Sequence, residues 1–159
     1  MKIQKIISPK EQELDELMEI WYRTNLTAHY FILADYWKSH YEEVKRALPE
    51  AGIYAVYAEK DQKEQKDQIL GFAGLTGSYI AGLFVKEEWQ SHGIGKMIID
   101  RIKEEKDSLE LHVFAENEGA VRFYIREGFE ILEEQRNSDT GKLEYQMVWS
   151  RAEGDGSHG

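Results

Sequence analysis

Apolar residues recur along this chain with two different periods, and the periods divide it into strands and helices. The segment 2–7 (KIQKII) predicts a short strand that ends at Ser8 and Pro9. Apolar residues then recur at three- and four-residue spacing, which predicts two helices before Pro49. Their apolar stripes are Leu14, Leu17, Met18 and Trp21 in the first helix, and Trp37, Tyr41, Val44 and Leu48 in the second.

The middle of the chain reads as three successive strands. The segments 52–59 (GIYAVYAE) and 68–76 (QILGFAGLT) are strand-like, and a highly charged hairpin loop (KDQKEQKDQ) separates them. The segment 77–86 (GSYIAGLFVK) predicts a third strand. Gly82 inside it indicates a β-bulge or a close approach of the backbone.

The second half predicts two more helices and three strands. A helix with Ile94, Met97, Ile98 and Ile102 as its apolar stripe precedes the period-2 strand 108–115 (SLELHVFA). Asn117 is typical of a helix N-cap, and Gly128 of a helix C-terminus. A final hairpin joins 129–137 to 142–150 through the turn SDTG. The order β-α-α-β-β-β-α-β-α-β-β predicts an α/β (mixed α+β) fold with a central mixed sheet of six or seven strands flanked by about four helices.

Length and composition predict one soluble domain. The 159 residues, 42% hydrophobic, suit a single domain over 1–151, followed by a disordered tail at 152–159. The net charge of −10 disfavours nucleic-acid binding. The absence of cysteine excludes a disulfide framework and a catalytic thiol, and it suits the cytoplasm. No segment reads as a signal peptide or a membrane span, and the five histidines lack metal-ligand spacing, so neither a membrane nor a metal is expected.

The sequence WQSHGIGKMIID contains two glycines, Gly93 and Gly95, just before a helix. A phosphate-binding P-loop requires Ser or Thr after Gly-Lys, but Met97 stands there. The dinucleotide fingerprint requires a third glycine where Ile98 stands. Both nucleotide motifs therefore fail. Two readings stay open for the glycines: a tight turn, or exposed amides at a helix N-terminus that bind a pyrophosphate.

A second motif follows about twenty residues later. Gln90-x-x-Gly93-x-Gly95, together with Asn117-x-x-Ala120-x-x-Phe123-Tyr124-x-x-x-Gly128-Phe129, resembles the acyl-CoA-binding signature of the GNAT (GCN5-related) N-acetyltransferases. The resemblance covers nearly the whole chain, and the order of elements also fits that fold. The segment 28–37 (AHYFILADYW) resembles the first helical region of the small bacterial YiaC/YjaB-type members.

The resemblance implies a site for acetyl-CoA. The strand Leu83, Phe84 and Val85 would lend backbone groups to the pantetheine arm, and an amide near Phe84 or Val85 would polarise the thioester carbonyl. The pyrophosphate would lie on the loop, and the next helix would supply further contacts. The loop residues are Gln90, Ser91, His92, Gly93, Ile94, Gly95 and Lys96, and the helix residues are Asn117, Ala120, Phe123 and Tyr124.

The resemblance also implies catalytic roles. Tyr124 would be the general acid for the departing CoA thiolate, with packing in the core as the competing interpretation. An amine nucleophile needs a base, and His112 is preferred because histidine titrates near neutrality. Glu116, His29 and Tyr79 are alternatives. The residues expected in the acceptor pocket are His29, Phe31 and Tyr79.

These features predict an acetyl-CoA-dependent N-acetyltransferase. With no cysteine, the acetyl group would pass directly to a primary amine in a ternary complex. The acceptor is a protein lysine or N-terminus, or a small-molecule amine, and the enzyme is a monomer or a homodimer. The alternative from another class is a catalytically silent CoA-binding sensor or interaction module.

Overall fold

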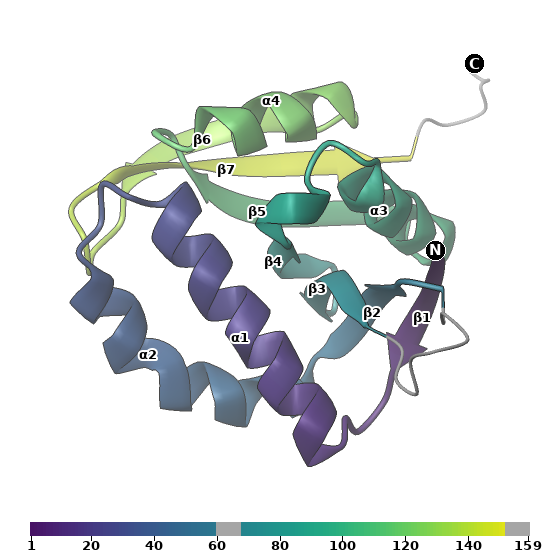
Figure 1. Cartoon of the computed structure of the whole chain (residues 1–159). Helices are drawn as coiled ribbons and strands as arrows, with labels where there is room; N and C mark the ends of the chain where they lie inside the picture. Colours follow the sequence, from purple (N-terminus) through teal and green to yellow (C-terminus); the bar gives the residue numbers. More distant parts are fainter. Residues whose placement is uncertain (60–67, 152–159) are drawn as a thin grey trace.

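The computed structural model describes residues 1–59 and 68–151, and its elements follow the predicted order (Figure 1). The predicted tail and nearly all of the charged hairpin loop lie outside these residues. The strands are β1 (Lys2–Ile6), β2 (Gly52–Tyr57), β3 (Ile69–Thr76), β4 (Tyr79–Val85), β5 (Ser108–Phe114), β6 (Glu130–Arg136) and β7 (Leu143–Ser150). The helices are α1 (Glu11–Ala28), α2 (Ala34–Ala47), α3 (Ile94–Glu105) and α4 (Glu118–Arg126), with short 3₁₀ turns η1 (Leu48–Glu50) and η2 (Glu87–Trp89).

The strands form one mixed sheet of order β1-β2-β3-β4-β5-β7-β6, with an apolar core on each face. Helices α1 and α2 cover one face, and α3 and α4 cover the other (Figure 1). The alternation predicted for β5 is confirmed: Leu111 and Val113 are buried under α3 and α4, whereas His112 and Phe114 face the α1 side. The predicted mixed α/β fold is therefore confirmed.

The sheet opens at its only parallel strand pair within the described residues. Strand β4 pairs with β5 at only two positions, Tyr79 with Glu110 and Ile80 with Leu111. Its register against β3 then shifts, so that Ala81 bulges. Beyond the bulge, β4 diverges from β5. Gly82 permits this course, because a Cβ atom there would lie 2.2 Å from the ring of Phe84.

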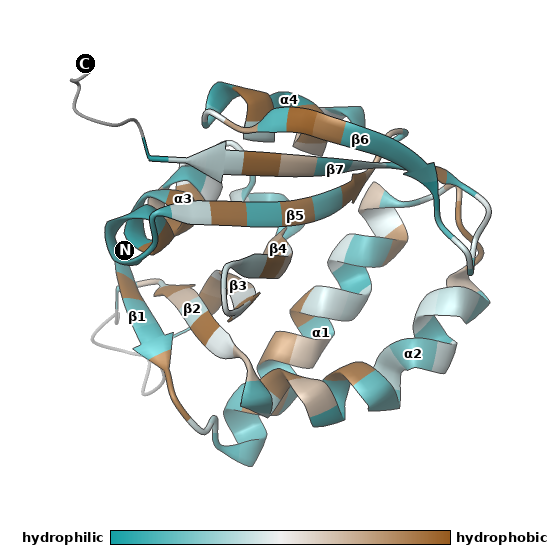
Figure 2. Ribbon diagram, turned by 180° about the vertical axis from the view of Figure 1, so that it is seen from behind, coloured by the Kyte–Doolittle hydropathy of each residue, from teal (hydrophilic) through white to brown (hydrophobic). Residues whose placement is uncertain are grey.

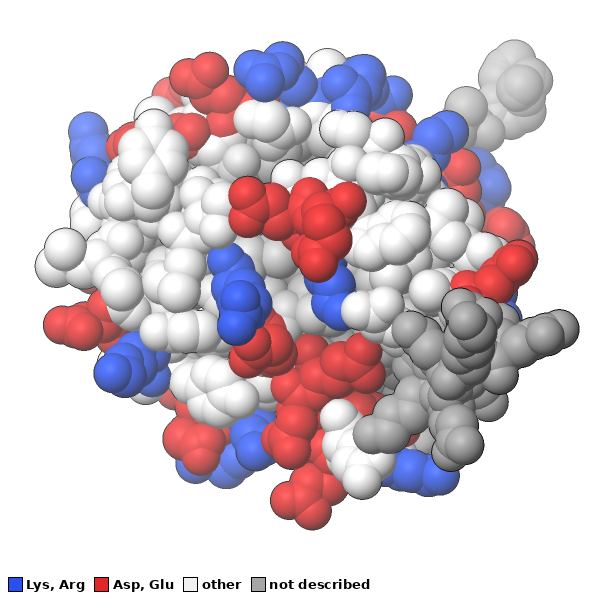
Figure 3. Space-filling view, in the orientation of Figure 1, with Lys and Arg blue, Asp and Glu red and all other residues white. Residues whose placement is uncertain are grey.

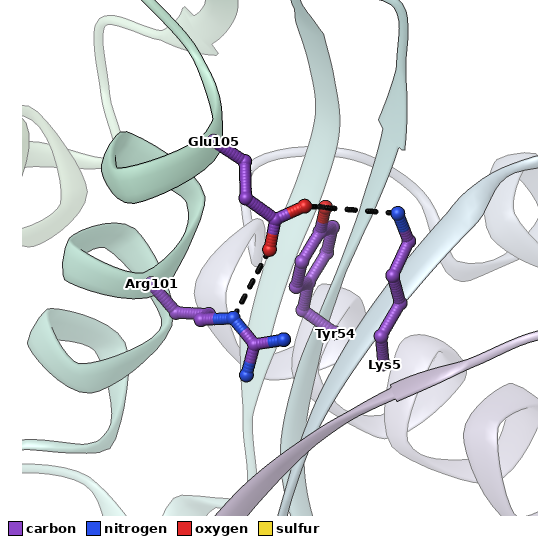
Figure 4. Close-up of polar contacts among 4 residues, drawn as sticks. All are labelled: Lys5, Tyr54, Arg101 and Glu105. Carbon is purple, nitrogen blue, oxygen red and sulfur yellow. Dashed lines mark hydrogen bonds and ion pairs between the residues drawn. The ribbon is translucent and has the colours of Figure 1, made fainter.

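Polar contacts tie α3 to the first strands, away from the opening (Figure 4). Tyr54 Oη donates to Glu105 Oε1 at 2.9 Å, and Lys5 Nζ lies 3.7 Å from the same oxygen. Arg101 Nε donates to Glu105 Oε2 at 3.0 Å. The hydrogen bond from Tyr54 is the largest cause that lowers the pKa of Glu105. This cluster stabilises the frame that carries the glycine loop.

The outer surface is strongly polar. The edge strand β6 is mostly hydrophilic (Figure 2), although Ile131 and Leu132 are exposed on it. Acidic side chains gather over the N-terminal half of α1 (Figure 3), where the sequence places Glu11, Glu13 and Glu16. Among the described helices, none has the length and hydropathy of a membrane span.

Candidate active site

The glycine loop places free backbone amides at the start of α3. Gly93 is the N-cap with φ of 80°, a left-handed conformation that glycine adopts without strain. Ser91, also in the loop, has φ of 66°, which is unfavourable for a residue with a side chain. The first helical bond runs from Met97 N to Gly93 O, so the N–H groups of Ile94, Gly95 and Lys96 have no acceptor within the helix. The loop therefore presents the donors that an anion requires.

A cleft of about 750 Å³, here called the glycine-loop cleft, lies against these amides. It extends from the loop, past the diverging part of β4, to the C-terminal half of α1. Its lining includes thirteen of the fourteen positions that the sequence assigns to the cofactor, and His92 is the exception. The thirteen are Leu83, Phe84, Val85, Gln90, Ser91, Gly93, Ile94, Gly95, Lys96, Asn117, Ala120, Phe123 and Tyr124.

The backbone of β4 turns two residues toward the cleft. Lys86 N donates to Leu70 O on β3, so the alternation of an antiparallel ladder turns Phe84 toward β3 and its neighbours Leu83 and Val85 away. Gln90 Nε2 donates to Val85 O at 3.2 Å, which agrees with this direction. The amides free to polarise a carbonyl are therefore those of Leu83 and Val85. The expectation that the amide of Phe84 could do so is wrong, because that amide points toward β3.

Three basic side chains near the loop lie in different settings. His92 does not line the cleft; its Nδ1 lies 2.9 Å from Gln90 O. Lys96 lines the cleft, but its ammonium lies 3.3 Å from Glu127 and 3.5 Å from Asp100. Arg126 lines the cleft, and no carboxylate of the described residues lies within ion-pair distance of it. Arg126 was not predicted from the sequence, because the resemblance assigns cofactor contacts on α4 and its N-cap only to Asn117, Ala120, Phe123 and Tyr124.

A chain of hydrogen bonds joins α1 to the N-terminus of α4. Asn25 is 4% exposed; its Nδ2 donates to Trp21 O at 2.9 Å, so its Oδ1 faces His29 Nδ1 at 3.0 Å. His29 Nδ1 must then carry the proton, and Nε2 accepts from Asn117 Nδ2 at 3.2 Å. Asn117 Oδ1 in turn caps α4 by accepting from Ala120 N at 3.4 Å. Every donor meets an acceptor only if His29 is neutral.

The surroundings of His29 are aromatic, which agrees with the neutral form. Its ring stacks on Trp37 with centroids 5.3 Å apart, and meets Phe31 and Phe114 edge-on. Burial lowers the pKa of His29 to about 4. Phe31, expected in the acceptor pocket, packs against His29 and Phe114 and lines neither cavity.

Tyr124 lies on α4 at the end of the cleft nearest the opening in the sheet. It is 7% exposed, and its ring meets Phe123 and Phe129 edge-on. Within the described part of the chain, its hydroxyl has no hydrogen-bond partner. Burial raises the pKa of Tyr124, so the phenol stays protonated across the neutral range.

A second cavity of about 380 Å³ meets the glycine-loop cleft at Tyr124. It lies on the α1 side of the sheet, and its lining includes Asn137 of the β6–β7 turn. Figures 1 and 2 both show this turn beside the connection between α1 and α2. His112 and Tyr79 line it, with Tyr79 Oη 3.3 Å from His112 Nδ1. The two cavities share seven lining residues: Asn25, His29, Leu83, Phe84, Asn117, Ala120 and Tyr124.

The glycine-loop cleft presents groups that suit acetyl-CoA. The free amides at the start of α3 suit a pyrophosphate, and the amides of Leu83 and Val85 suit an extended amide-containing arm. Gly95 makes room beside Phe123, whose ring atom would lie 3.1 Å from a Cβ atom at that position. No group of three or more metal-ligating side chains occurs among the described residues.

The roles of Asn25 and Glu144 in the second cavity were not predicted from the sequence. Asn25 stands four residues before His29, so helical spacing alone offered a signal for that pair. Glu144 stands in a strand of mixed polarity, and nothing local distinguishes it from the other acidic residues of the hairpin.

Comparison with known proteins agrees with this geometry. The chain is similar to two curated Escherichia coli (strain K12) proteins: peptidyl-lysine N-acetyltransferase YjaB (29% identical, covering 84% of this chain and 86% of that protein) and peptidyl-lysine N-acetyltransferase YiaC (28% identical, covering 88% and 92%). Its structure is similar to the solution structure of apo YjaB from E. coli, with a TM-score of 0.77, 25% identity and coverage of 96% of this chain and 100% of that one.

A further solved structure shares the fold. The PaiA N-acetyltransferase from Thermoplasma acidophilum in complex with coenzyme A has a TM-score of 0.70 at 17% identity, covering 94% of this chain and 99% of that one. The family model described as "Acetyltransferase (GNAT) domain" matches residues 32–150. The chain therefore belongs to the GNAT acetyltransferase family.

Proposed function

We propose that this acetyl-CoA-dependent N-acetyltransferase transfers the acetyl group to the ε-amine of lysine side chains in peptides or proteins. The observation that carries the proposal is the junction of the two cavities at Tyr124. An amine that enters the second cavity reaches the thioester end of the glycine-loop cleft. The lysine acceptor is supported by the two E. coli relatives, which are named peptidyl-lysine N-acetyltransferases.

The residues around the junction support a direct transfer. Bound acetyl-CoA supplies an acetyl group that is already activated as a thioester. In this proposal the N–H groups of Leu83 and Val85 polarise its carbonyl, and Tyr124 protonates the departing sulfur. With no cysteine in the chain, attack by the amine in a ternary complex is the simplest course. The presence of Tyr124 and the enzymatic relatives disfavour a catalytically silent sensor.

His112 is the best candidate for the base among the four considered. His29 uses its free nitrogen to accept from Asn117, and Glu116 lines neither cavity. Burial raises the pKa of Tyr79, which keeps that hydroxyl protonated. His112 lines the second cavity, and if Nδ1 donates to Tyr79 Oη, its Nε2 is free to accept the proton of the amine.

Replacing His112 with alanine is expected to lower kcat/KM by about a hundredfold and to flatten the acidic limb of the pH profile of kcat/KM, because the general base is lost. The pH dependence of kcat/KM, measured with acetyl-CoA at saturation, tests this. A variant that keeps the shape of the wild-type profile would show that the base lies elsewhere.

The acceptor class is tested with a peptide that has an acetylated N-terminus and a single lysine. Incubation with acetyl-CoA should modify the lysine, as read by mass spectrometry. The same peptide with a free N-terminus and no lysine, and a set of small amines, should react much more slowly. Faster reaction of the lysine-free peptide or of a small amine would contradict the lysine proposal and identify that acceptor class instead. The choice between monomer and homodimer, with β6 as the edge available for pairing, stays a prediction.

A further inference from the structure

A buried carboxylate lines the second cavity with no positive charge beside it. Glu144 on β7 is 9% exposed. It accepts hydrogen bonds from two neutral amides, Gln135 Nε2 at 2.9 Å and Asn137 Nδ2 at 3.4 Å. No lysine or arginine of the described residues lies within ion-pair distance of it, and Lys142, two residues earlier, pairs with Glu116 instead.

Burying a carboxylate charge destabilises the folded protein unless a cation or hydrogen bonds compensate the loss of hydration. Buried acidic side chains are normally paired with a cation, because the loss of hydration exceeds what neutral hydrogen bonds return. A carboxylate has about four acceptor positions, and the two amides use only two of them. Glu144 lines the second cavity, whose lining contains neither lysine nor arginine.

Aromatic rings form the other walls near this carboxylate. Tyr36 and Trp37 on α2 and Tyr79 on β4 all line the same cavity. Burial raises the pKa of both tyrosines. Nearby negative charges raise it further: those of Asp139 and then Glu144 at Tyr36, and those of Glu144 and then Glu110 at Tyr79. Aromatic faces and a carboxylate around one space are the environment that an alkylammonium group prefers.

Glu144 lies close to His112, the base proposed for the acetyl transfer. In the β5–β7 ladder Glu144 stands opposite Phe114, and Gln146 stands opposite His112. Side chains two residues apart on a strand share a face, so Glu144 and His112 are diagonal neighbours on the α1 side of the sheet. An ammonium held by Glu144 therefore lies near the base proposed to deprotonate it.

We propose that Glu144, with the rings of Tyr36, Trp37 and Tyr79, forms a cation-recognition site that admits the acceptor in its ammonium form. The site selects an alkylammonium on an apolar stem and disfavours amines that carry a neighbouring carboxylate. His112 then removes one proton from the bound ammonium, which leaves the neutral amine for attack. This inference rests on the proposed function for the identity of the acceptor, but the recognition of charge is measurable without any transfer.

The test compares a charged and an uncharged ligand that differ only in their terminal group. Nα-acetyl-lysine amide and Nα-acetyl-6-hydroxynorleucine amide have the same stem, and the second carries a hydroxyl where the first carries the ammonium. Their binding to the enzyme–CoA complex, which cannot transfer an acetyl group, is measured by calorimetry at neutral pH. The wild type should prefer the lysine derivative by at least about tenfold.

Glu144→Gln should reduce that preference to within about twofold, because the amide keeps the shape and loses the charge. Glu110→Gln is the matched control: Glu110 lies on the same face and accepts from Gln146 Nε2 at 2.8 Å, but it lines neither cavity. The control should keep the wild-type preference. Tyr36→Leu, on α2, should also lower the preference for the lysine derivative. It is the variant to measure if Glu144→Gln does not fold.

Equal binding of the two ligands by the wild type, or no binding of the lysine derivative up to its solubility limit, would overturn the inference. An unchanged preference in folded Glu144→Gln would overturn it as well. A preference that depends on Glu144 in an enzyme that acetylates no lysine peptide would support the cation site and reject the proposed acceptor. The two proposals can therefore fail separately.

Discussion

Replacing Tyr124 with phenylalanine is expected to lower kcat by at least about a hundredfold and to leave the affinity for acetyl-CoA within a few-fold, because only the donated proton is lost. The phenylalanine ring keeps the edge-on contacts with Phe123 and Phe129, so the wall of the cleft is preserved. The raised pKa of Tyr124 does not oppose its role. The departing thiolate forms in the same buried place, where its charge is equally disfavoured and a proton neutralises it.

The measurement is steady-state kinetics, with acetyl-CoA binding followed separately by calorimetry. Tyr22→Phe is the matched control, since Tyr22 packs against Tyr41 and lines neither cavity. The loss of kcat in Tyr124→Phe should be smaller with an acetyl thioester whose leaving thiol is more acidic than that of CoA, because such a thiolate departs without a proton. If Tyr124→Phe turns over at the wild-type rate, Tyr124 has only a packing role.

Acidification is expected to destabilise the protein through His29. The pKa of His29 in the folded state is about 4, below the value of about 6.5 for an unfolded chain. Between these values the unfolded state binds the extra proton, so this contribution to stability is complete above about pH 6.5 and is lost as the pH falls toward 4. Its total size is about 3 kcal/mol, of which about 2 kcal/mol is lost between about pH 7 and pH 5.

The comparison of the wild type with His29→Gln isolates this contribution from other titrating groups. Glutamine does not titrate, and its amide can both donate to Asn25 and accept from Asn117. The free energy of unfolding in urea, measured across this pH range, should fall more steeply in the wild type by about 2 kcal/mol. Parallel curves for the two proteins would show that His29 is not held neutral by the fold.

The same protonation would remove the acceptor that holds Asn117. In the neutral form, His29 Nε2 accepts from Asn117 Nδ2, and the network continues to the N-cap of α4. A proton on Nε2 would place two donors against each other. The start of α4 and the glycine-loop cleft would then lose their link to α1, so weaker binding of acetyl-CoA is expected to accompany the loss of stability.

Much of the candidate site could be predicted from the sequence because its signals are local. The positive φ of Gly93 and the capping by Asn117 depend on a few neighbouring residues, and both follow from turn and cap chemistry. His112 and Tyr79 were recognised as separate candidates on two strands. Their contact at 3.3 Å required the pairing of β4 with β5, which no local pattern specifies.

The sequence by itself determined the order of the elements, the two faces of each strand and the glycine loop, because periodicity and turn-forming residues act within one or two turns of the chain. The tertiary structure alone decided where the sheet opens and which side chains meet there. His29 reaches Asn117 across 88 residues, and Glu144 lines the same cavity as the aromatic rings of α2 and β4 only because of the order of the strands. Contacts between distant segments depend on packing and strand pairing, and these are properties of the whole fold.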